Sequence, residues 1–433
     1  MNPISLSDPK KRVLMISYPF FPNPSAGAVR SGRFARYLTE YGWRVDVVTI
    51  KPQVTGNQSS EFICKGVNVH RTDTLDPWLN LSKSVPENII LRAIRSILMK
   101  IFSFPDHMLL WLPFALKKGL DICEECKINA IYTTSPPHST QIIGYLLSKM
   151  TGIPWVSDFR DPWTLNAYKD MNRVDNLLLQ FSALIENAVY KKADVILVNT
   201  LANRQKMVTH FPMIPEKKII YLPNGWEPFG DDIYRGNRND KDCLTIVHAG
   251  TFYPRFKPYA LFHALSCWKK RMCGSDFPDY PDNRIQVILL GSNDPITKQL
   301  LEELDLQNIV QIRKWVKQEE AWRNMCQADI LLATLGTGEE SATYIPSKLF
   351  EYIAAKRPII GFFPEGVACD LIRDTQTGVV FTSDDPLPVI RFLNSMIVQK
   401  ESAGIPYTPN AKVVQFYHIR NRVQALSDIF SVL

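Results

Sequence analysis

The stretch Val13-Leu-Met-Ile-Ser17 opens the pattern that decides the fold class of this 433-residue chain. Its apolar residues form a run too short for a helix, which predicts a buried strand. A loop over residues 18–27 follows, then an amphipathic stretch from Ala28 to Tyr41, and then a second apolar run, Arg44–Ile50. A strand, a helix and a strand in this order predict a βαβ unit with parallel strands.

The same alternation continues along the chain, pauses in a polar segment over residues 223–242, and then restarts. Strands are predicted before the pause at Ala130–Thr134, Trp155–Asp158, Val195–Asn199 and Lys218–Leu222, and after it at Leu244–Ala249, Ile285–Leu290, Ile309–Ile312, Ile330–Ala333 and Pro358–Gly361. Helices of the second half are predicted at Pro258–Met272, Ile296–Leu304, Glu319–Cys326 and Ser347–Ala355. The pattern therefore predicts an α/β protein with Rossmann-like domains over 1–222 and 243–408, a linker over 223–242, and a helical end over 409–433.

The composition excludes several classes of protein. With 45% hydrophobic and 21% charged residues, the chain does not resemble disordered proteins. No apolar stretch approaches the roughly 18 residues that a membrane span needs, and no signal peptide is evident. The eight cysteines do not form a disulfide framework. We expect a cytoplasmic protein, soluble or peripheral to a membrane. The net charge of +7 is no signature of nucleic-acid binding, but it suits an anionic substrate or membrane surface.

Glycine follows the first strand of each predicted domain. Gly27 stands where the first loop enters a helix, and such a junction exposes N–H groups to a phosphate. Arg30 lies in the first turn of that helix, whereas Arg33 and Arg36 are expected on a solvated face. The loop is not G-x-G-x-x-G, so a dinucleotide site is only weakly indicated.

Gly250 follows the strand Leu244–Ala249 and lets a ligand approach the backbone. Arg255 and Lys257 come next in the same loop. A diphosphate leaving group needs such positive charge where no metal supplies it. Each of the two cations could equally be an ordinary surface residue.

The stretch Tyr344-Ile-Pro-Ser-Lys-Leu-Phe-Glu351 carries the sharpest signal for a ligand. Ser347 is predicted to cap a helix whose first turn holds Lys348, and Glu351 lies one turn further on the same face. Lys348 can then reach a phosphate while Glu351 accepts hydrogen bonds from vicinal ribose hydroxyls. A simple salt bridge between the two residues is the alternative.

Polar residues also end a strand of the first domain, where ligands of α/β proteins usually bind. Asp158, Arg160 and Asp161 could orient acceptor hydroxyls or stabilise positive charge on a sugar ring, or could form a buried network that fixes the following loop. His138 could line the cleft or merely start a helix. His248 is predicted to be a core histidine.

The order of these motifs resembles the bacterial retaining glycosyltransferases of family 4, the group 1 transferases. That family has the GT-B fold, in which two Rossmann-like domains face each other across a cleft. Besides the opening βαβ pattern, five segments carry the resemblance, and they are Tyr132–His138, Asp158–Trp163, Leu222–Trp226, His248–Thr251 and Pro346–Tyr352. The region from about Asn57 to Leu120 resembles the family least.

The resemblance implies a donor nucleotide-diphosphate sugar on the second domain and an acceptor on the first. By analogy Glu351 holds the ribose, Lys348 with Arg255 or Lys257 holds the diphosphate, and Gly27 approaches it across the cleft. It also suggests that the final helix crosses back onto the first domain. Thr343 stands where the family often has an earlier glutamate that contacts the transferred sugar, a departure that leaves the donor sugar undefined.

Two further expectations concern metal and membrane. The only Asp-x-Asp, Asp240-Lys-Asp242, falls in the polar linker, so no metal or other cofactor is expected. Ile89–Phe102 could form a basic amphipathic helix on an anionic membrane, with Met108–Phe114 adding aromatic bulk, or could simply cover the sheet.

The sequence thus predicts a metal-independent glycosyltransferase that acts on a saccharide or lipid-linked saccharide acceptor in cell-surface polysaccharide synthesis. One rival is a sugar-nucleotide epimerase on the same fold. The other is a non-catalytic scaffold that has lost donor chemistry, which Thr343 would favour.

Overall fold

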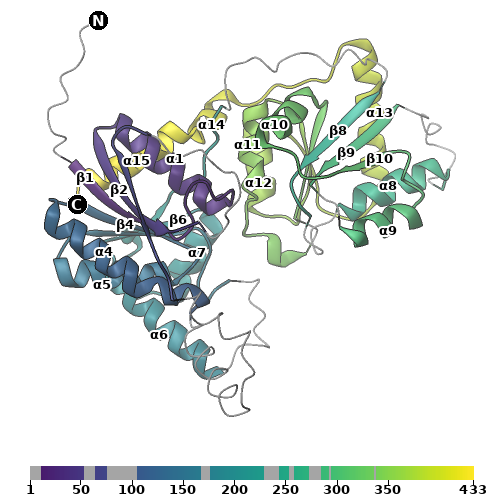
Figure 1. Cartoon of the computed structure of the whole chain (residues 1–433). Helices are drawn as coiled ribbons and strands as arrows, with labels where there is room; N and C mark the ends of the chain where they lie inside the picture. The colour runs from purple at the N-terminus through teal and green to yellow at the C-terminus, as the bar shows by residue number, and fades with distance from the viewer. Residues whose placement is uncertain are drawn as a thin grey trace, which may run out of the picture. The chain divides into compact units, whose positions relative to one another are not determined.

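The computed structural model shows two compact α/β units (Figure 1). Unit 1 comprises Met1–Asn224 and Ile419–Leu433, and unit 2 comprises Gly225–His418. The structure describes residues 11–52, 64–75, 105–166, 176–228, 243–252, 258–272, 284–291, 294–335 and 338–433. The predicted helix Ile89–Phe102, the Asp240-Lys-Asp242 run and the Arg255–Lys257 pair lie outside these residues.

Unit 1 is built on a 7-stranded parallel sheet in the order β3-β2-β1-β4-β5-β6-β7. Its strands are β1 (Lys11–Ile16), β2 (Trp43–Ile50), β3 (Val67–Thr72), β4 (Ala130–Ser135), β5 (Trp155–Phe159), β6 (Val195–Val198) and β7 (Ile219–Tyr221). The central strands are buried on both faces, which explains why their sequences read as continuous apolar runs.

Helices cover both faces of this sheet (Figure 1). They are α1 (Ala26–Glu40), α4 (Leu112–Glu125), α5 (Ser139–Thr151), α6 (Asn176–Lys192), α7 (Leu201–His210) and α15 (Ile419–Ser431), with short 3-10 turns η2 (His107–Trp111) and η4 (Glu216–Lys218). α1 and α15 pack over one face, and α4, α5 and α6 over the other. Ser25 caps α1 through a side-chain hydrogen bond from the Ala28 N–H.

Unit 2 repeats the architecture with a 6-stranded parallel sheet in the order β10-β9-β8-β11-β12-β13. Its strands are β8 (Leu244–Ala249), β9 (Ile285–Leu290), β10 (Val310–Arg313), β11 (Ile330–Thr334), β12 (Ile359–Phe362) and β13 (Gly378–Phe381). Its helices are α8 (Tyr259–Lys269), α9 (Pro295–Glu303), α10 (Gln318–Gln327), α11 (Lys348–Ala355), α12 (Val367–Thr375), α13 (Pro386–Ser402) and α14 (Ala411–Phe416), with a 3-10 turn η7 (Glu339–Ser341). α8 and α13 pack on one face, and α10, α11 and α12 on the other.

The C-terminal segment, which the sequence predicts to be helical over 409–433, is divided between the units. α14 belongs to unit 2 and α15 to unit 1. The chain enters and leaves unit 2 at adjacent points. Trp226 donates its backbone N–H to Tyr417 O (2.9 Å) and its indole N–H to Val414 O (2.8 Å). Two hydrogen bonds therefore join the first and last segments of unit 2.

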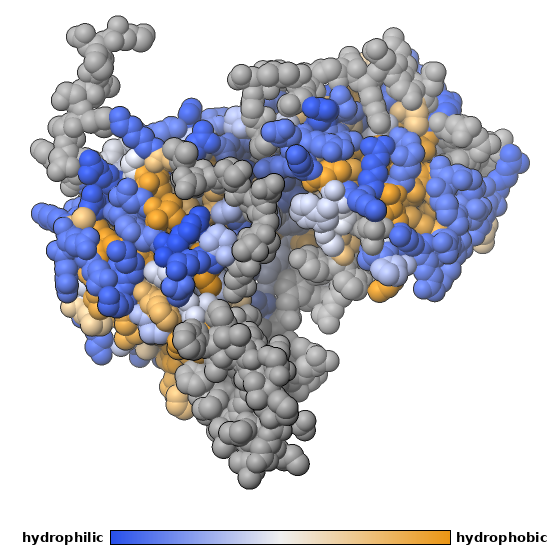
Figure 2. Space-filling view, viewed as in Figure 1, coloured by the Kyte–Doolittle hydropathy of each residue, from blue (hydrophilic) through white to orange (hydrophobic). Residues whose placement is uncertain are grey.

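The aromatic residue expected to strengthen a membrane contact is instead part of the core. Trp111 is fully buried, donates its indole N–H to Thr72 Oγ1 (2.7 Å) and packs edge-on against Tyr18. Of the two alternatives for this segment, the burial of Trp111 supports the one in which it covers the sheet. No helix among the described residues is long and apolar enough to cross a membrane. Hydrophilic residues dominate the visible face of both units, with hydrophobic atoms in small separate areas (Figure 2).

Candidate functional site

The candidate donor site of unit 2 lies where β8 ends. Gly250 follows the strand with φ +123°, a conformation that favours glycine. The preceding N–H, of Ala249, donates to the Tyr352 hydroxyl on α11 (3.0 Å), and that hydroxyl donates in turn to Leu332 O on β11 (3.1 Å). These two bonds attach the helix to the carboxyl ends of β8 and β11.

His248 and Lys348 meet directly beside this glycine. His248 Nδ1 is 2.8 Å from Leu332 O and therefore carries the proton, so Nε2 accepts from the Lys348 ammonium at 3.1 Å. His248 is fully buried and stacks on Phe252 with ring centroids 4.0 Å apart. The predicted core histidine is thus a neutral support for Lys348, because burial and the nearby ammonium hold its pKa well below the usual range.

Lys348 is a cation held in low-dielectric surroundings. Burial lowers its pKa to about 8, and the nearby Glu351 carboxylate opposes that shift. Among the described residues Lys348 forms no ion pair with Glu351, so the simple salt bridge is not what holds it. Ser347 occupies the N-cap position, but its side chain makes no capping hydrogen bond, contrary to the prediction.

Other predicted donor-site residues take different places. Glu351 lies in the first turn of α11 and is half-buried. Gly250 lies so near Lys348 that an added Cβ would stand 3.0 Å from the ammonium nitrogen. The partner cations Arg255 and Lys257 lie outside the described residues. Within the described part of the chain, no group of three or more His, Cys, Asp or Glu residues could hold a metal ion.

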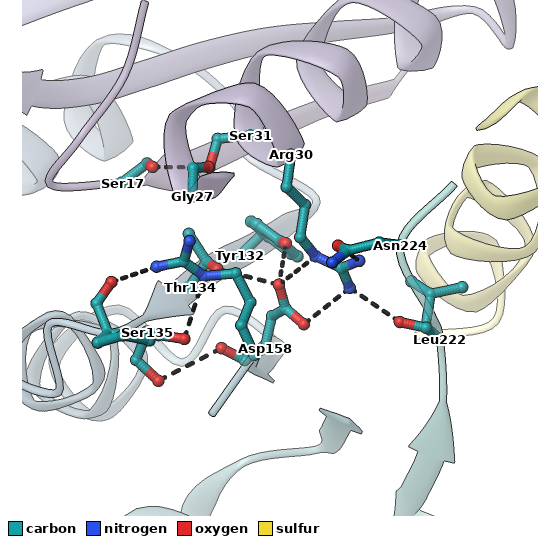
Figure 3. A network of polar contacts seen from close by, with 12 residues as sticks. Ser17, Gly27, Arg30, Ser31, Tyr132, Thr134, Ser135, Asp158, Leu222 and Asn224 are labelled. Atoms are coloured by element: carbon teal, nitrogen blue, oxygen red, sulfur yellow. Dashed lines mark hydrogen bonds and ion pairs between the residues drawn. The ribbon is translucent and has the colours of Figure 1, made fainter. Parts of the chain in front are cut away.

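In unit 1 the polar residues that end β5 form a buried network (Figure 3). Asp158 is fully buried and accepts four hydrogen bonds, from Arg30 Nε (2.9 Å) and Nη2 (3.0 Å), Tyr132 (2.6 Å) and Thr134 (3.0 Å). The carboxylate is fully enclosed by these protein donors and is not open to an acceptor hydroxyl. The geometry therefore favours the buried network over direct contact with a substrate.

Arg30 is the partner of Asp158, and the sequence did not indicate this pairing. It is buried, and besides Asp158 it donates to Leu222 O (2.9 Å) and Asn224 Oδ1 (2.9 Å), at the boundary of unit 1 (Figure 3). The sequence placed Arg30 in the first turn of a helix expected to begin at Ala28, but α1 begins at Ala26 and the Arg30 side chain points back towards the sheet (Figure 3). Its partner Asp158 lies 128 residues away in the chain, so the local sequence does not indicate the pairing.

Arg160 lies on the other side of the same network. Its Nε donates to Ser135 O (3.2 Å), its Nη2 donates to Pro136 O, and its guanidinium occupies the space where a Cβ on Gly27 would stand. Position 27 must therefore be glycine to leave room for the Arg160 side chain, and this packing reason was not evident from the sequence. Burial lowers the pKa of Arg160 and raises that of Asp161, because it disfavours the charged form of each.

His138 precedes α5 and is nearly buried. Its ring stacks on Trp163 with centroids 5.0 Å apart and planes inclined by 10°. Trp163 follows Arg160 in the loop after β5, so the histidine packs against that loop. It lies among aromatic side chains, and this contact supports the structural alternative more than an open position in a cleft.

The comparisons with known proteins agree with this architecture. Residues 25–225 match the family model of the glycosyl transferase 4-like domain, which covers most of unit 1. No curated protein sequence matches the chain.

Three solved structures illustrate the likeness in fold. HepE from Anabaena, solved with UDP and glucose, has a TM-score of 0.64 at 14% identity over 98% of this chain and 100% of its own. Sucrose-phosphate synthase from Thermosynechococcus elongatus has a TM-score of 0.60 at 14% identity over 98% and 97%. WaaG, a glycosyltransferase of lipopolysaccharide biosynthesis, has a TM-score of 0.59 at 15% identity over 97% and 99%. The predicted GT-B fold and the resemblance to family 4 glycosyltransferases are confirmed.

Proposed function

We propose that this chain transfers a sugar from a nucleotide-diphosphate sugar to a saccharide or lipid-linked saccharide acceptor, in the synthesis of a cell-surface polysaccharide. In this proposal unit 2 binds the donor and unit 1 binds the acceptor. Configuration at the transferred carbon is retained, by analogy with the family. The enzyme acts in the cytoplasm, at the inner face of the membrane when its acceptor is lipid-linked.

The observation that carries the proposal is the Lys348 ammonium beside Gly250 and His248. A neutral imidazole orients this ammonium without neutralising it, so its charge remains available to an anion. The absence of a Cβ at Gly250 leaves room next to the nitrogen. An oxygen of a diphosphate is the ligand that such a site suits.

The remaining donor contacts follow from chemistry and from the relatives. We propose that Glu351, which lies one helical turn beyond Lys348, accepts hydrogen bonds from ribose hydroxyls. The solved complexes of HepE contain UDP or UDP-glucose, so uridine nucleotides are the first donors to test. Because Lys348, Arg255 and Lys257 supply positive charge, we propose that the leaving diphosphate needs no metal ion.

Calorimetric titration of the full-length chain with UDP, with and without EDTA, tests the donor site. Lys348→Ala should weaken UDP binding at least tenfold, and EDTA should leave it unchanged. Lys298→Ala, which removes an exposed lysine of α9 in the same unit, is the matched control and should bind UDP normally. Equal binding by the two variants would remove Lys348 from the site.

Product analysis with UDP-sugars separates the proposal from its rivals. A transferase releases UDP faster when a saccharide acceptor is added, whereas an epimerase converts the donor sugar without one. Glu351→Ala should strongly reduce donor turnover, and Glu302→Ala, an exposed glutamate on α9, should not. A folded chain that binds neither UDP nor GDP would be a scaffold, and the proposed function would fail.

A further inference from the structure

Arg160 of unit 1 is a cation without a direct ion pair among the described residues, although the charges of Asp158 and Asp161 act on it. Two of its three nitrogens bind backbone carbonyls, at Ser135 and Pro136. Carbonyl oxygens orient a guanidinium but carry no formal charge. Among the described residues, no carboxylate forms an ion pair with Arg160.

The two carboxylates whose charges act on Arg160 belong to Asp158 and Asp161. Asp158 accepts two hydrogen bonds from Arg30 and two from the hydroxyls of Tyr132 and Thr134. Its direct ion pair is therefore with Arg30 and not with Arg160. Asp161 follows Arg160 in the chain, and the two charges stabilise each other without a direct ion pair. Neither carboxylate hydrogen-bonds Arg160, so its remaining N–H groups stay available to a ligand.

The free part of the guanidinium faces the start of α1. Nη1 makes no hydrogen bond to any described residue, and it lies against Gly27, in the first turn of that helix. The positive end of the 15-residue helix adds to the field of the arginine. This position is at the carboxyl edge of the sheet, because β4 ends at Ser135, which pairs with Phe159 at the end of β5.

The loop that carries Arg160 is held rigidly. Trp163 donates its indole N–H to Ser182 on α6 (3.1 Å). The fully buried Glu186 on the same helix accepts from the Thr164 N–H (3.3 Å) and from Tyr190 (2.6 Å). A cation on so well supported a loop keeps its geometry without a ligand, as a binding residue requires.

We propose that Arg160 is an anion-binding residue, and that the substrate of unit 1 therefore carries a carboxylate or phosphate group. The proposal deepens the proposed function, on which it rests, by naming the chemical class of the ligand. The oxyanion belongs to an acidic or phosphorylated acceptor saccharide. Nη1 offers two N–H groups to such an oxyanion.

The test uses the full-length chain with Lys348→Ala, so that the donor cation of unit 2 does not contribute. Calorimetric titrations use glucose 6-phosphate, glucuronate and, as the neutral comparison, glucose. Adding Arg160→Gln should weaken binding of the two anions at least tenfold and leave any binding of glucose unchanged. Adding Arg36→Gln, an exposed arginine on α1, should change none of them.

Gly27→Ala is a second variant in case Arg160→Gln does not fold. It keeps the charge but places a methyl group where the guanidinium lies, so it should also weaken anion binding. Unchanged anion affinity in both variants would overturn the proposal. So would tight binding of glucose that neither variant alters, with no binding of the anions.

Competition with UDP, measured in the chain that retains Lys348, tests whether the anion is an acceptor group. Glucose 6-phosphate and UDP should bind together, and displacement of glucose 6-phosphate by UDP would overturn the assignment to the acceptor. The two proposals fail separately. Loss of all UDP binding with Arg160-dependent anion binding retained would overturn the donor site alone, and the reverse would overturn only the role of Arg160.

Discussion

Lys348 Nζ lies 3.1 Å from Nε2 of His248, a histidine that is fully buried and donates its single ring N–H, at Nδ1, to the Leu332 carbonyl. The imidazole is therefore a neutral acceptor that directs the ammonium group towards the end of β8. A carboxylate at the same position would neutralise Lys348 and compete with a phosphate. The pairing thus positions a charge and keeps it available, which suits the binding of an anionic leaving group.

The affinity for UDP should fall as the pH rises through about 8. Burial lowers the pKa of Lys348 to about 8, so the charged form that binds a diphosphate is fully present below this pH and is lost above it. Binding of an anion raises this pKa, so the complex takes up a proton. Titrations from pH 7 to 9.5 should show the dissociation constant rising towards about tenfold per pH unit. A flat profile would contradict the role of Lys348.

Gly250→Ala should impair donor binding more than it impairs stability. The backbone at φ +123° disfavours any side chain, and the new Cβ would lie 3.0 Å from Lys348 Nζ. We expect a loss of about 1–3 kcal/mol in unfolding free energy and at least tenfold weaker UDP binding. Gly404→Ala is the control, since its φ is +85° but nothing lies within 4 Å of its added Cβ. Normal UDP affinity in Gly250→Ala would show that the ligand does not approach there.

Asp158→Asn should destabilise unit 1 strongly, by about 3–5 kcal/mol, because it leaves the buried Arg30 guanidinium without its counter-ion. Tyr132→Phe removes one hydrogen bond to the same carboxylate and should cost about 1–3 kcal/mol. Denaturant unfolding measures both losses. If Asp158→Asn keeps full stability but loses turnover, Asp158 is a catalytic group and not a member of a structural network.

Phe430→Ala should cost about 3–5 kcal/mol in the stability of unit 1. The ring lies on α15 and packs edge-on against Trp43 at 5.3 Å and Tyr132 at 6.3 Å, so its removal leaves a cavity where the C-terminal helix meets the sheet. Phe416→Ala, which removes a ring that is 43% exposed on α14, should cost about 1 kcal/mol or less. Equal thermal shifts for the two variants would show that α15 contributes little.

The sequence predicts best the strands in which consecutive residues are apolar and buried. β8 and β9 were predicted with their observed bounds, because both faces of a central parallel strand are buried and every residue is apolar or nearly so. The edge strands β3 and β13 were missed. Their residues are mostly half-buried, so neither a long apolar run nor a clear alternation marks them.

The sequence by itself determined the two parallel α/β units and the helix that carries Lys348 and Glu351, since these follow from local apolar patterns and short spacings. The tertiary structure alone decided which charges are available. His248 meets Lys348 across 100 residues, and Arg30 meets Asp158 across 128. Local patterns do not record such pairings, because they form only when separate strands and helices pack together. Those pairings orient Lys348 through a neutral imidazole and place Arg30 in a buried ion pair with Asp158.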